Sequence, residues 1–163
     1  MKPLVEIARY DDPYSLVEGV DEIGLLQRLD GPAVLHFKGH DTSRCRAIVT
    51  LLHGNEPSGL RAILRLAKEG FVPLVNTCVV IASSKASITP PHFSYRMLPG
   101  HDDLNRCFSG EGNMHQQALA SAITKVLVEC SPEAIIDLHN TSGKGPDFCV
   151  STCGDKACTA LAS

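Results

Sequence analysis

The chain has 163 residues, of which 44% are hydrophobic and 20% charged, and its formal net charge at pH 7 is −3. This length predicts one domain with a sizeable core, and the weak negative charge gives no reason to expect a nucleic acid or an anionic membrane as partner. No apolar run is long enough to span a bilayer, and residues 1–7 carry an early acid and lack the apolar core of a secretory signal. We therefore expect a cytoplasmic protein.

Seven cysteines are scattered along the chain, most of them within apolar segments. Without a signal peptide, the expected state is reduced, buried thiols rather than disulfides. Cys149 and Cys153 have a spacing that suits two metal ligands, but no second Cys or His pair completes such a site. We therefore do not interpret these two residues as ligands.

The first fifty residues predict a helix and two strands. Residues 1–20 are expected to be irregular, whereas residues 21–29 predict a short helix, because Asp21 is a suitable N-cap before apolar residues at helical spacing. Residues 33–37 and 46–52 have the composition of strands and are separated by a polar turn. This arrangement predicts an early hairpin.

Residues 57–70 predict a helix, because Pro57 suits a first turn, the apolar side chains form one stripe, and Gly70 is a stop signal. The remaining expected elements are a strand covered on both faces, a long loop that is functional or disordered, an amphipathic helix, a buried strand and a short last strand. They correspond to residues 77–82, 83–112, 113–129, 134–138 and 148–151, in that order.

This alternation of strands and helices predicts an α/β sandwich with a mixed sheet, in which residues 1–30 are a lead-in and residues 31–163 the core. Residues 155–163 begin like a helix and stop without a C-cap signal. We therefore expect a truncated domain with an exposed sheet edge or apolar patch. Self-association is one way to cover such a surface.

Two histidines and a glutamate follow two of the expected strands. His53 and Glu56 come after the strand that ends at Leu52, and His139 follows the strand that ends at Leu138. Two imidazoles and one carboxylate at the ends of neighbouring strands supply the three protein ligands of an open, catalytic zinc site. A structural zinc site usually has four ligands, with cysteines among them.

Each of these residues also has an ordinary structural interpretation. Glu56 would favour the positive end of the following helix, and the two histidines would be hydrogen-bonded residues at strand ends. Asp137 alternates with His139 on its strand and is either a core carboxylate or a group that orients the histidine. Gly54 is expected to allow the sharp turn between His53 and the helix.

The long loop holds Arg96 and the run Asp102-Asp-Leu-Asn-Arg106. A guanidinium is a planar fork that suits a carboxylate, and Asn105 adds a neutral donor and acceptor beside it. Near a metal, one guanidinium would stabilise an oxyanion while the other holds a substrate carboxylate. A solvated, charged loop with local turns is the alternative interpretation.

Three motifs occur in a fixed order: His-Gly-Asn-Glu at 53–56, Asp-Leu-Asn-Arg at 103–106 and Asp-Leu-His-Asn-Thr at 137–141. Together they resemble the succinylglutamate desuccinylase/aspartoacylase family, a branch of the zinc carboxypeptidase-like hydrolases. The resemblance covers about residues 45–152. It implies a three-layer α/β sandwich with a mixed central sheet, of which this chain would be the N-terminal portion.

The resemblance also implies residue roles. His53, Glu56 and His139 would bind Zn²⁺, Arg96 would polarise the scissile carbonyl, and Asn105 and Arg106 would bind the carboxylate of a small-molecule N-acyl amino acid. The implied reaction is zinc-assisted amide hydrolysis, in which a glutamate takes the proton of the attacking water. In the family that glutamate lies in a Glu-x-Gly segment well downstream of the third ligand. No glutamate follows His139 here, so we expect the general base beyond Ser163 and little or no activity in this chain alone.

Two other functions remain open. The first is a non-catalytic metal- or ligand-binding domain of the same fold, and the second is a carboxypeptidase that acts on peptides with the same residues. Within the hydrolase hypothesis, the residues do not indicate which acyl group and amino acid are accepted.

Overall fold

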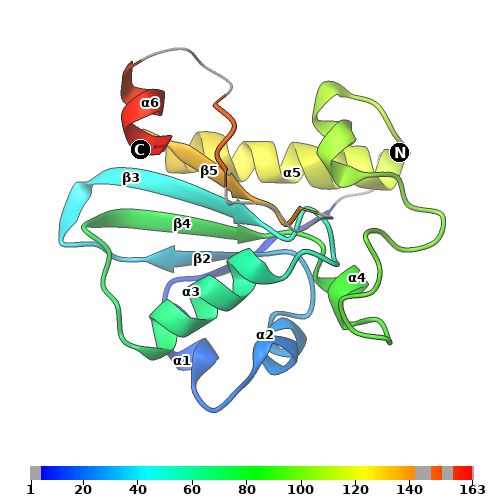
Figure 1. Cartoon of the computed structure of the whole chain (residues 1–163), viewed down its shortest axis with the longest axis horizontal. Coiled ribbons are helices and arrows are strands. Elements are labelled where there is room, and N and C mark those ends of the chain that lie inside the picture. The colour runs from blue at the N-terminus through cyan, green and yellow to red at the C-terminus, as the bar shows by residue number, and fades with distance from the viewer. Residues whose placement is uncertain (1–4, 142–147, 152–155, 163) are drawn as a thin grey trace.

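The computed structural model describes residues 5–141, 148–151 and 156–162, which form a five-stranded mixed sheet in the order β1-β2-β4-β3-β5 (Figure 1). β2 is antiparallel to β4, and the other neighbouring strands are parallel. The strands are β1 (Ala8–Tyr10), β2 (Ala33–Phe37), β3 (Asp41–Thr50), β4 (Val75–Ile81) and β5 (Ile135–Leu138). The sheet confirms the α/β class and the mixed sheet expected from the sequence.

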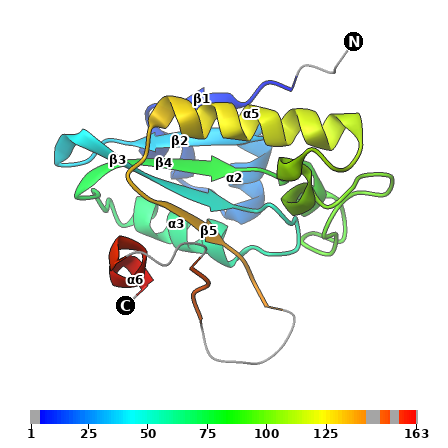
Figure 2. The ribbon, with the colours of Figure 1, turned by 90° about the horizontal axis from the view of Figure 1, so that it is seen from above.

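Helices cover both faces of this sheet (Figure 2). One apolar core joins Leu25, Leu60 and Val79, and the core on the other face joins Val80 and Ile123. The helical elements are α1 (Pro13–Val17), α2 (Glu22–Leu29), α3 (Ser58–Lys68), α4 (Ser84–Ile88), the 3-10 helix η1 (Leu104–Ser109), α5 (Met114–Cys130) and α6 (Lys156–Ala162). Within the described residues, no helix combines the length and apolar character needed to cross a membrane.

Two of the expected helices begin at capping side chains, of which Asp21 was predicted as an N-cap. The Asp21 side chain accepts a hydrogen bond from the backbone N–H of Gly24 at the start of α2. Asn113 does the same for Gln116 at the start of α5. Each cap satisfies a backbone donor that has no partner inside the helix, which is why the sequence locates these two ends well.

The hairpin expected between residues 33–37 and 46–52 is wrong. These segments correspond to β2 and β3, and β4 lies between the two strands. Residues Val79–Ile81 of β4 are fully buried. A continuous apolar strand of this kind is best covered when it has neighbours on both sides and helices on both faces. A hairpin between β2 and β3 would have displaced β4 from that central position.

Three further expectations need correction. Residues 8–10, expected to be irregular, form β1 and pair with β2. The expected strand at residues 148–151 is absent, and the Phe148 and Val150 side chains there are exposed. The long loop contains α4 and η1, each too short to show a periodic pattern.

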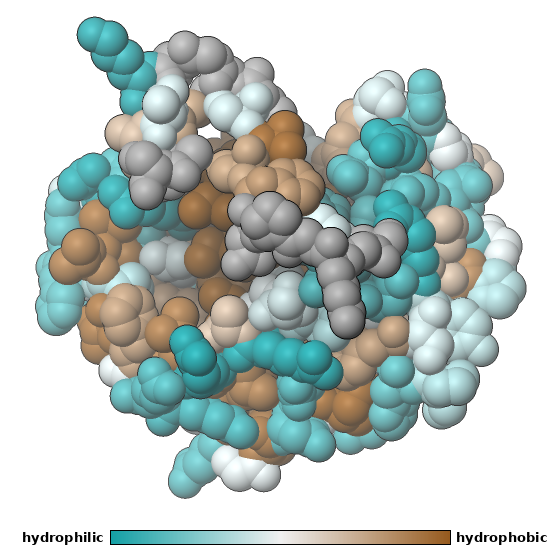
Figure 3. Space-filling model, viewed as in Figure 1, coloured by the Kyte–Doolittle hydropathy of each residue, from teal (hydrophilic) through white to brown (hydrophobic). Residues whose placement is uncertain are grey.

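The strand expected to be buried at residues 134–138 is instead an edge strand. β5 lies at the margin of the sheet formed by the described residues, and Ile135 and Ile136 are 51% and 39% exposed. A four-residue apolar run has the same composition in a central and in an edge strand, so the sequence did not distinguish them. The exposed apolar edge itself agrees with expectation, and Figure 3 shows hydrophobic side chains at the surface in this region.

The described cysteines are mainly free thiols, as expected, with one exception. Cys45, Cys78, Cys107, Cys130 and Cys149 are free. Cys158 is disulfide-bonded, so the expectation of reduced thiols is wrong at that position. That expectation rested on the inferred compartment and on the apolar character of most of the segments that hold the cysteines, and neither identifies which cysteine is an exception. Cys153 lies outside the described residues.

Glu133 connects the segment before β5 to the first half of β3. Its carboxylate accepts hydrogen bonds from Nε of Arg44 at 2.8 Å and Nε of Arg46 at 2.7 Å. Its backbone N–H donates to the carbonyl of Cys45 at 2.8 Å. Hydrogen bonds from Arg46 and Arg44 lower the pKa of Glu133 below its ordinary value. The folded protein therefore keeps this carboxylate ionised at a lower pH than the unfolded chain does.

We predict that Glu133→Gln will flatten the acid limb of the stability curve. The stabilisation from Glu133 is complete above its unfolded-state pKa, about 4.3, and is lost as the pH falls through the lower folded-state value. Urea denaturation at a series of acid pH values measures this slope. Glu69→Gln is the control, because the Glu69 carboxylate lies 3.8 Å from Arg65 and makes no closer contact with it. An unchanged slope in Glu133→Gln would contradict the prediction.

Candidate metal centre

The parallel pairing of β3 and β5 brings the two expected histidine positions to the same edge of the sheet. Thr50 at the end of β3 pairs with Leu138 at the end of β5. His139 follows Leu138 directly, and His53 lies three residues after Thr50. The backbone between Thr50 and His53 turns at Leu51, which has a φ of 55° and a fully buried side chain.

Gly54 is required for space rather than for a left-handed backbone. A Cβ atom at this position would lie 2.6 Å from Cβ of Ala86 and 2.7 Å from the carbonyl oxygen of Tyr95. The Gly54 N–H donates to the carbonyl of Arg96 at 2.9 Å. The glycine therefore lets the turn after β3 contact the long loop, and this contact fixes the loop beside His53.

The side chains of His53, Glu56 and His139 converge, and we call them the His53–Glu56–His139 trio. Nδ1 of His53 lies 3.0 Å from Oε1 of Glu56, and Nδ1 of His139 lies 2.8 Å from Oε2. The backbone N–H of Asn140 donates to the same Oε2 at 3.1 Å. His53 and Glu56 are buried, whereas the His139 side chain is 31% exposed. One ligand atom from each residue lies within 4.8 Å of the others, a spacing that suits a single ion.

The opposite nitrogen of each imidazole contacts a second carboxylate. Nε2 of His53 lies 2.8 Å from Oδ1 of Asp103, and Nε2 of His139 lies 2.8 Å from Oδ2 of Asp137. Without an ion, a proton on Nδ1 would be donated to Glu56. In a metal-bound state, a proton on each Nε2 would instead be donated to these aspartates, and the Nδ1 lone pairs would be available to the ion. Metal-binding histidines are held in this way. Asp137 is thus a group that orients His139, not a core carboxylate.

The charges around the trio favour a cation. Three carboxylates, from Glu56, Asp103 and Asp137, face one guanidinium, that of Arg96. With neutral imidazoles the formal charge of this group is −2, which a divalent ion would neutralise.

The pKa shifts follow from the same contacts. Burial alone would raise the pKa of Glu56, but hydrogen bonds from Asn140 and His139 lower it below its ordinary value. Burial also acts to raise the pKa of Asp103, and hydrogen bonds from His53 and Arg96 outweigh it and lower that pKa. Burial would lower the pKa of His139, whereas its bonds to Asp137 and Glu56 raise it. The carboxylates are therefore ionised at neutral pH, as ligands to a cation must be.

Arg96 lies beside the trio. Its Nη1 donates to Oε1 of Glu56 and its Nη2 to Oδ2 of Asp103, both at 3.1 Å. The Arg96 side chain is 43% exposed, so one side of the guanidinium remains open to solvent. Asn105 and Arg106 lie in η1, directly after Asp103. In the part of the chain that the structure describes, neither side chain hydrogen-bonds to the trio.

Two contacts at the site were not predicted from the sequence. Asp103 belonged to a recognised motif, but its position gave no reason to pair it with His53, fifty residues earlier. Asn140 accepts hydrogen bonds from the hydroxyl and the backbone N–H of Ser58 at the start of α3. These two bonds join the residue after His139 to the helix after Glu56. The place of Asn140 in the motif at 137–141, directly after His139, was the sequence signal for this residue.

Comparison with known proteins gives no assignment, since no family model, no curated protein and no solved structure matches this chain. The site must therefore be judged on its own residues. Those residues form a largely buried His-Glu-His group that could bind a metal ion.

Proposed function

We propose that this chain carries the metal-binding part of a zinc-dependent hydrolase that cleaves the amide bond of an N-acyl amino acid. The observation that carries the proposal is the arrangement of the two histidines. Each Nδ1 faces the Glu56 carboxylate, and each Nε2 is held by an aspartate. The three ordered motifs and their resemblance to the desuccinylase/aspartoacylase family support the same interpretation.

The donor set of the trio fits zinc. Two imidazole nitrogens and one carboxylate are a known ligand set of catalytic zinc, which leaves a fourth position for water or substrate. When bound, the ion would act as a Lewis acid toward a carbonyl oxygen and would lower the pKa of a coordinated water. The His139 side chain is 31% exposed, so the trio is open to solvent on that side.

Arg96 is suited to bind the carbonyl oxygen of a substrate. Its guanidinium already lies beside Glu56 and is partly exposed, so a negative charge that develops on that oxygen would meet a fixed cation. Asn105 and Arg106, in the neighbouring η1, are the proposed partners of the substrate carboxylate. The Arg106 side chain is exposed and free to take part in a paired, two-hydrogen-bond contact.

The carboxylates nearest the trio are already engaged. The Glu56 carboxylate contacts Nδ1 of both imidazoles. Asp103 contacts Nε2 of His53, and Asp137 contacts Nε2 of His139. Among the described residues at the site, none of these three is left to take a proton from water. The proposal therefore assigns binding of the metal and the substrate to this chain, and little or no turnover.

The preference for a transition-state analogue tests this proposal. A phosphonate that imitates the tetrahedral form of N-acetyl-aspartate or N-succinyl-glutamate should bind the zinc-loaded chain at least about 100-fold more tightly than the amide itself. Arg96→Gln should reduce that ratio by about tenfold or more, since the lost charge acts mainly on the analogue. Calorimetry measures both affinities. Arg61→Gln is the matched control, because the Arg61 guanidinium pairs with Glu22 and makes no hydrogen bond to the trio among the described residues.

Equal affinity for analogue and amide would favour the non-catalytic binding domain instead. Tighter binding of short peptides than of N-acyl amino acids would favour a peptide carboxypeptidase. Rapid hydrolysis by this chain would contradict the inference that no carboxylate beside the trio is available as the general base.

A further inference from the structure

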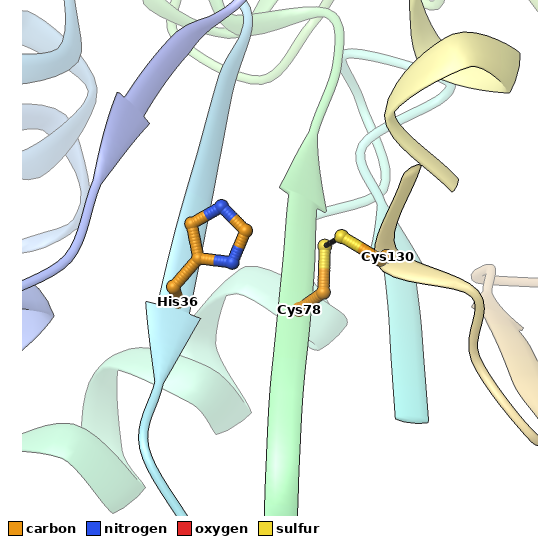
Figure 4. Close-up of side chains that lie close together, drawn as sticks. All are labelled: His36, Cys78 and Cys130. Carbon is orange, nitrogen blue, oxygen red and sulfur yellow. Dashed lines mark hydrogen bonds between the residues drawn. The ribbon is translucent and has the colours of Figure 1, made fainter. Parts of the chain in front are cut away.

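A second cluster of possible metal ligands lies on the α5 side of the sheet. Figure 4 shows the imidazole of His36 on β2 beside the thiols of Cys78 on β4 and Cys130 at the end of α5. His36 and Cys78 are register partners in the antiparallel β2–β4 pair, so their side chains project from the same face. We call these residues the His36–Cys78–Cys130 cluster. It shares no residue with the trio.

The spacing of the cluster suits one ion. A nitrogen of His36 and the two sulfur atoms all lie within 4.8 Å of one another. The Sγ atoms of Cys78 and Cys130 are 3.1 Å apart. Two thiolates bound tetrahedrally at the usual Zn–S length of about 2.3 Å are roughly 3.7 Å apart, so a small rotation of one side chain would accommodate the ion. Cys130 is the last residue of its helix, where such an adjustment costs little.

The cluster is also accessible. A cavity of about 920 Å³ is lined by all three residues and by Cys45. Cys78 itself is 1% exposed, so its sulfur is largely shielded from bulk water. A metal site needs both a route for the ion and a position from which solvent is largely excluded.

Two simpler interpretations explain less of the arrangement. Burial raises the pKa of the Cys78 thiol, so a pair of packed, protonated core thiols would account for the sulfur contact. A disulfide would also account for it. Neither gives a reason for an imidazole on the neighbouring strand with a nitrogen within 4.8 Å of both sulfurs.

We propose that His36, Cys78 and Cys130 bind a thiophilic cation, Zn²⁺, at a site independent of the trio. Binding replaces the two thiol protons, which pass to solvent, and leaves the thiolates and the imidazole nitrogen as ligands. Thiolate and imidazole donors together select zinc over magnesium or calcium. Cys45 lines the same cavity, so its thiolate or a water in the cavity would be available as a fourth ligand.

Cobalt substitution tests this site. Co²⁺ added anaerobically to the reduced, metal-free chain should produce a near-ultraviolet sulfur-to-cobalt charge-transfer band. The band should be lost in Cys78→Ser and in Cys130→Ser. Cys149→Ser, which removes an exposed free thiol, is the matched control and should keep it. The His53→Ala/His139→Ala double variant should also keep it, because the trio has no sulfur ligand, so failure of one site is distinguishable from failure of the other.

Absence of the band in the unmodified chain would overturn the proposal. So would a band that persists in both serine variants. If a serine variant does not fold, as judged by circular dichroism, His36→Gln provides the second test. His36 is only partly buried, and its replacement should weaken Co²⁺ binding by about tenfold or more without loss of the fold. Unchanged affinity in His36→Gln would contradict the assignment.

Discussion

His53→Ala and His139→Ala should each lose most of the zinc from the trio, with affinity reduced by at least about 100-fold. Each substitution removes one of only three protein ligands, which leaves the Glu56 carboxylate and a single imidazole. Asp137→Asn should cost less, about 10- to 100-fold, because Asp137 orients His139 and does not belong to the trio. Competition with a chromophoric chelator measures the affinities, and elemental analysis measures the bound zinc.

The graded result separates a metal site from an ordinary hydrogen-bond network. In a network without a metal, the three substitutions would alter stability and leave the zinc content unchanged. His40→Ala is the control, because His40 is exposed and lies just before β3, at the end opposite His53. The His36–Cys78–Cys130 cluster must be blocked with Cys78→Ser in all proteins compared, so that only the trio is measured. Stoichiometric zinc in both histidine variants would refute the site.

Gly54→Ala should destabilise the protein and disturb the trio together. The added Cβ would approach Cβ of Ala86 to 2.6 Å and the carbonyl oxygen of Tyr95 to 2.7 Å, closer than real Cβ contacts allow. Overpacking of this kind costs about 1–3 kcal/mol, whereas the entropy gained by replacing glycine is worth only about 0.4–1 kcal/mol. Since backbone atoms must move, we expect a net loss near the upper end of that range.

The movement should also weaken the hydrogen bond from Gly54 to the carbonyl of Arg96, and with it the position of that guanidinium. Urea denaturation of the metal-free protein gives the change in unfolding free energy, and zinc affinity gives the effect on the site. Asn55→Ala, at the adjacent exposed position, should change stability by less than about 0.5 kcal/mol. A Gly54→Ala protein as stable as Asn55→Ala would show that the turn has space for a side chain.

The sequence predicted the trio because its members stand next to strong local patterns. His53 and His139 follow apolar strands, and Pro57 and Gly70 mark the ends of the helix after Glu56. These signals depend on only a few neighbouring residues, so they can be recognised from the sequence without knowledge of the fold. The parallel pairing of β3 with β5 then confirmed that the two strand ends are neighbours.

The features that the sequence missed depend on contacts between distant segments. The central place of β4 follows from competition among strands for neighbours, and no turn signal encodes it. The pairing of Asp103 with His53 depends on the path of a loop that has no periodicity. The zinc carboxypeptidase-like fold, the hydrolase activity and the N-acyl amino acid substrate remain proposals, because they rest on the motifs and on the geometry of the site.

His53 and Glu56 belong to the turn after β3, which has a strand on each side. His139 follows β5, which pairs with β3 alone among the described strands. An ion held by all three residues would therefore cross-link the interior of the sheet to its margin. Occupancy of the site and the stability of β5 would be thermodynamically linked. Metal binding would stabilise β5, and removal of the metal by a chelator would destabilise it. The exposed surface that contains Ile135 and Ile136 would then be more ordered at high metal concentration than at low metal concentration.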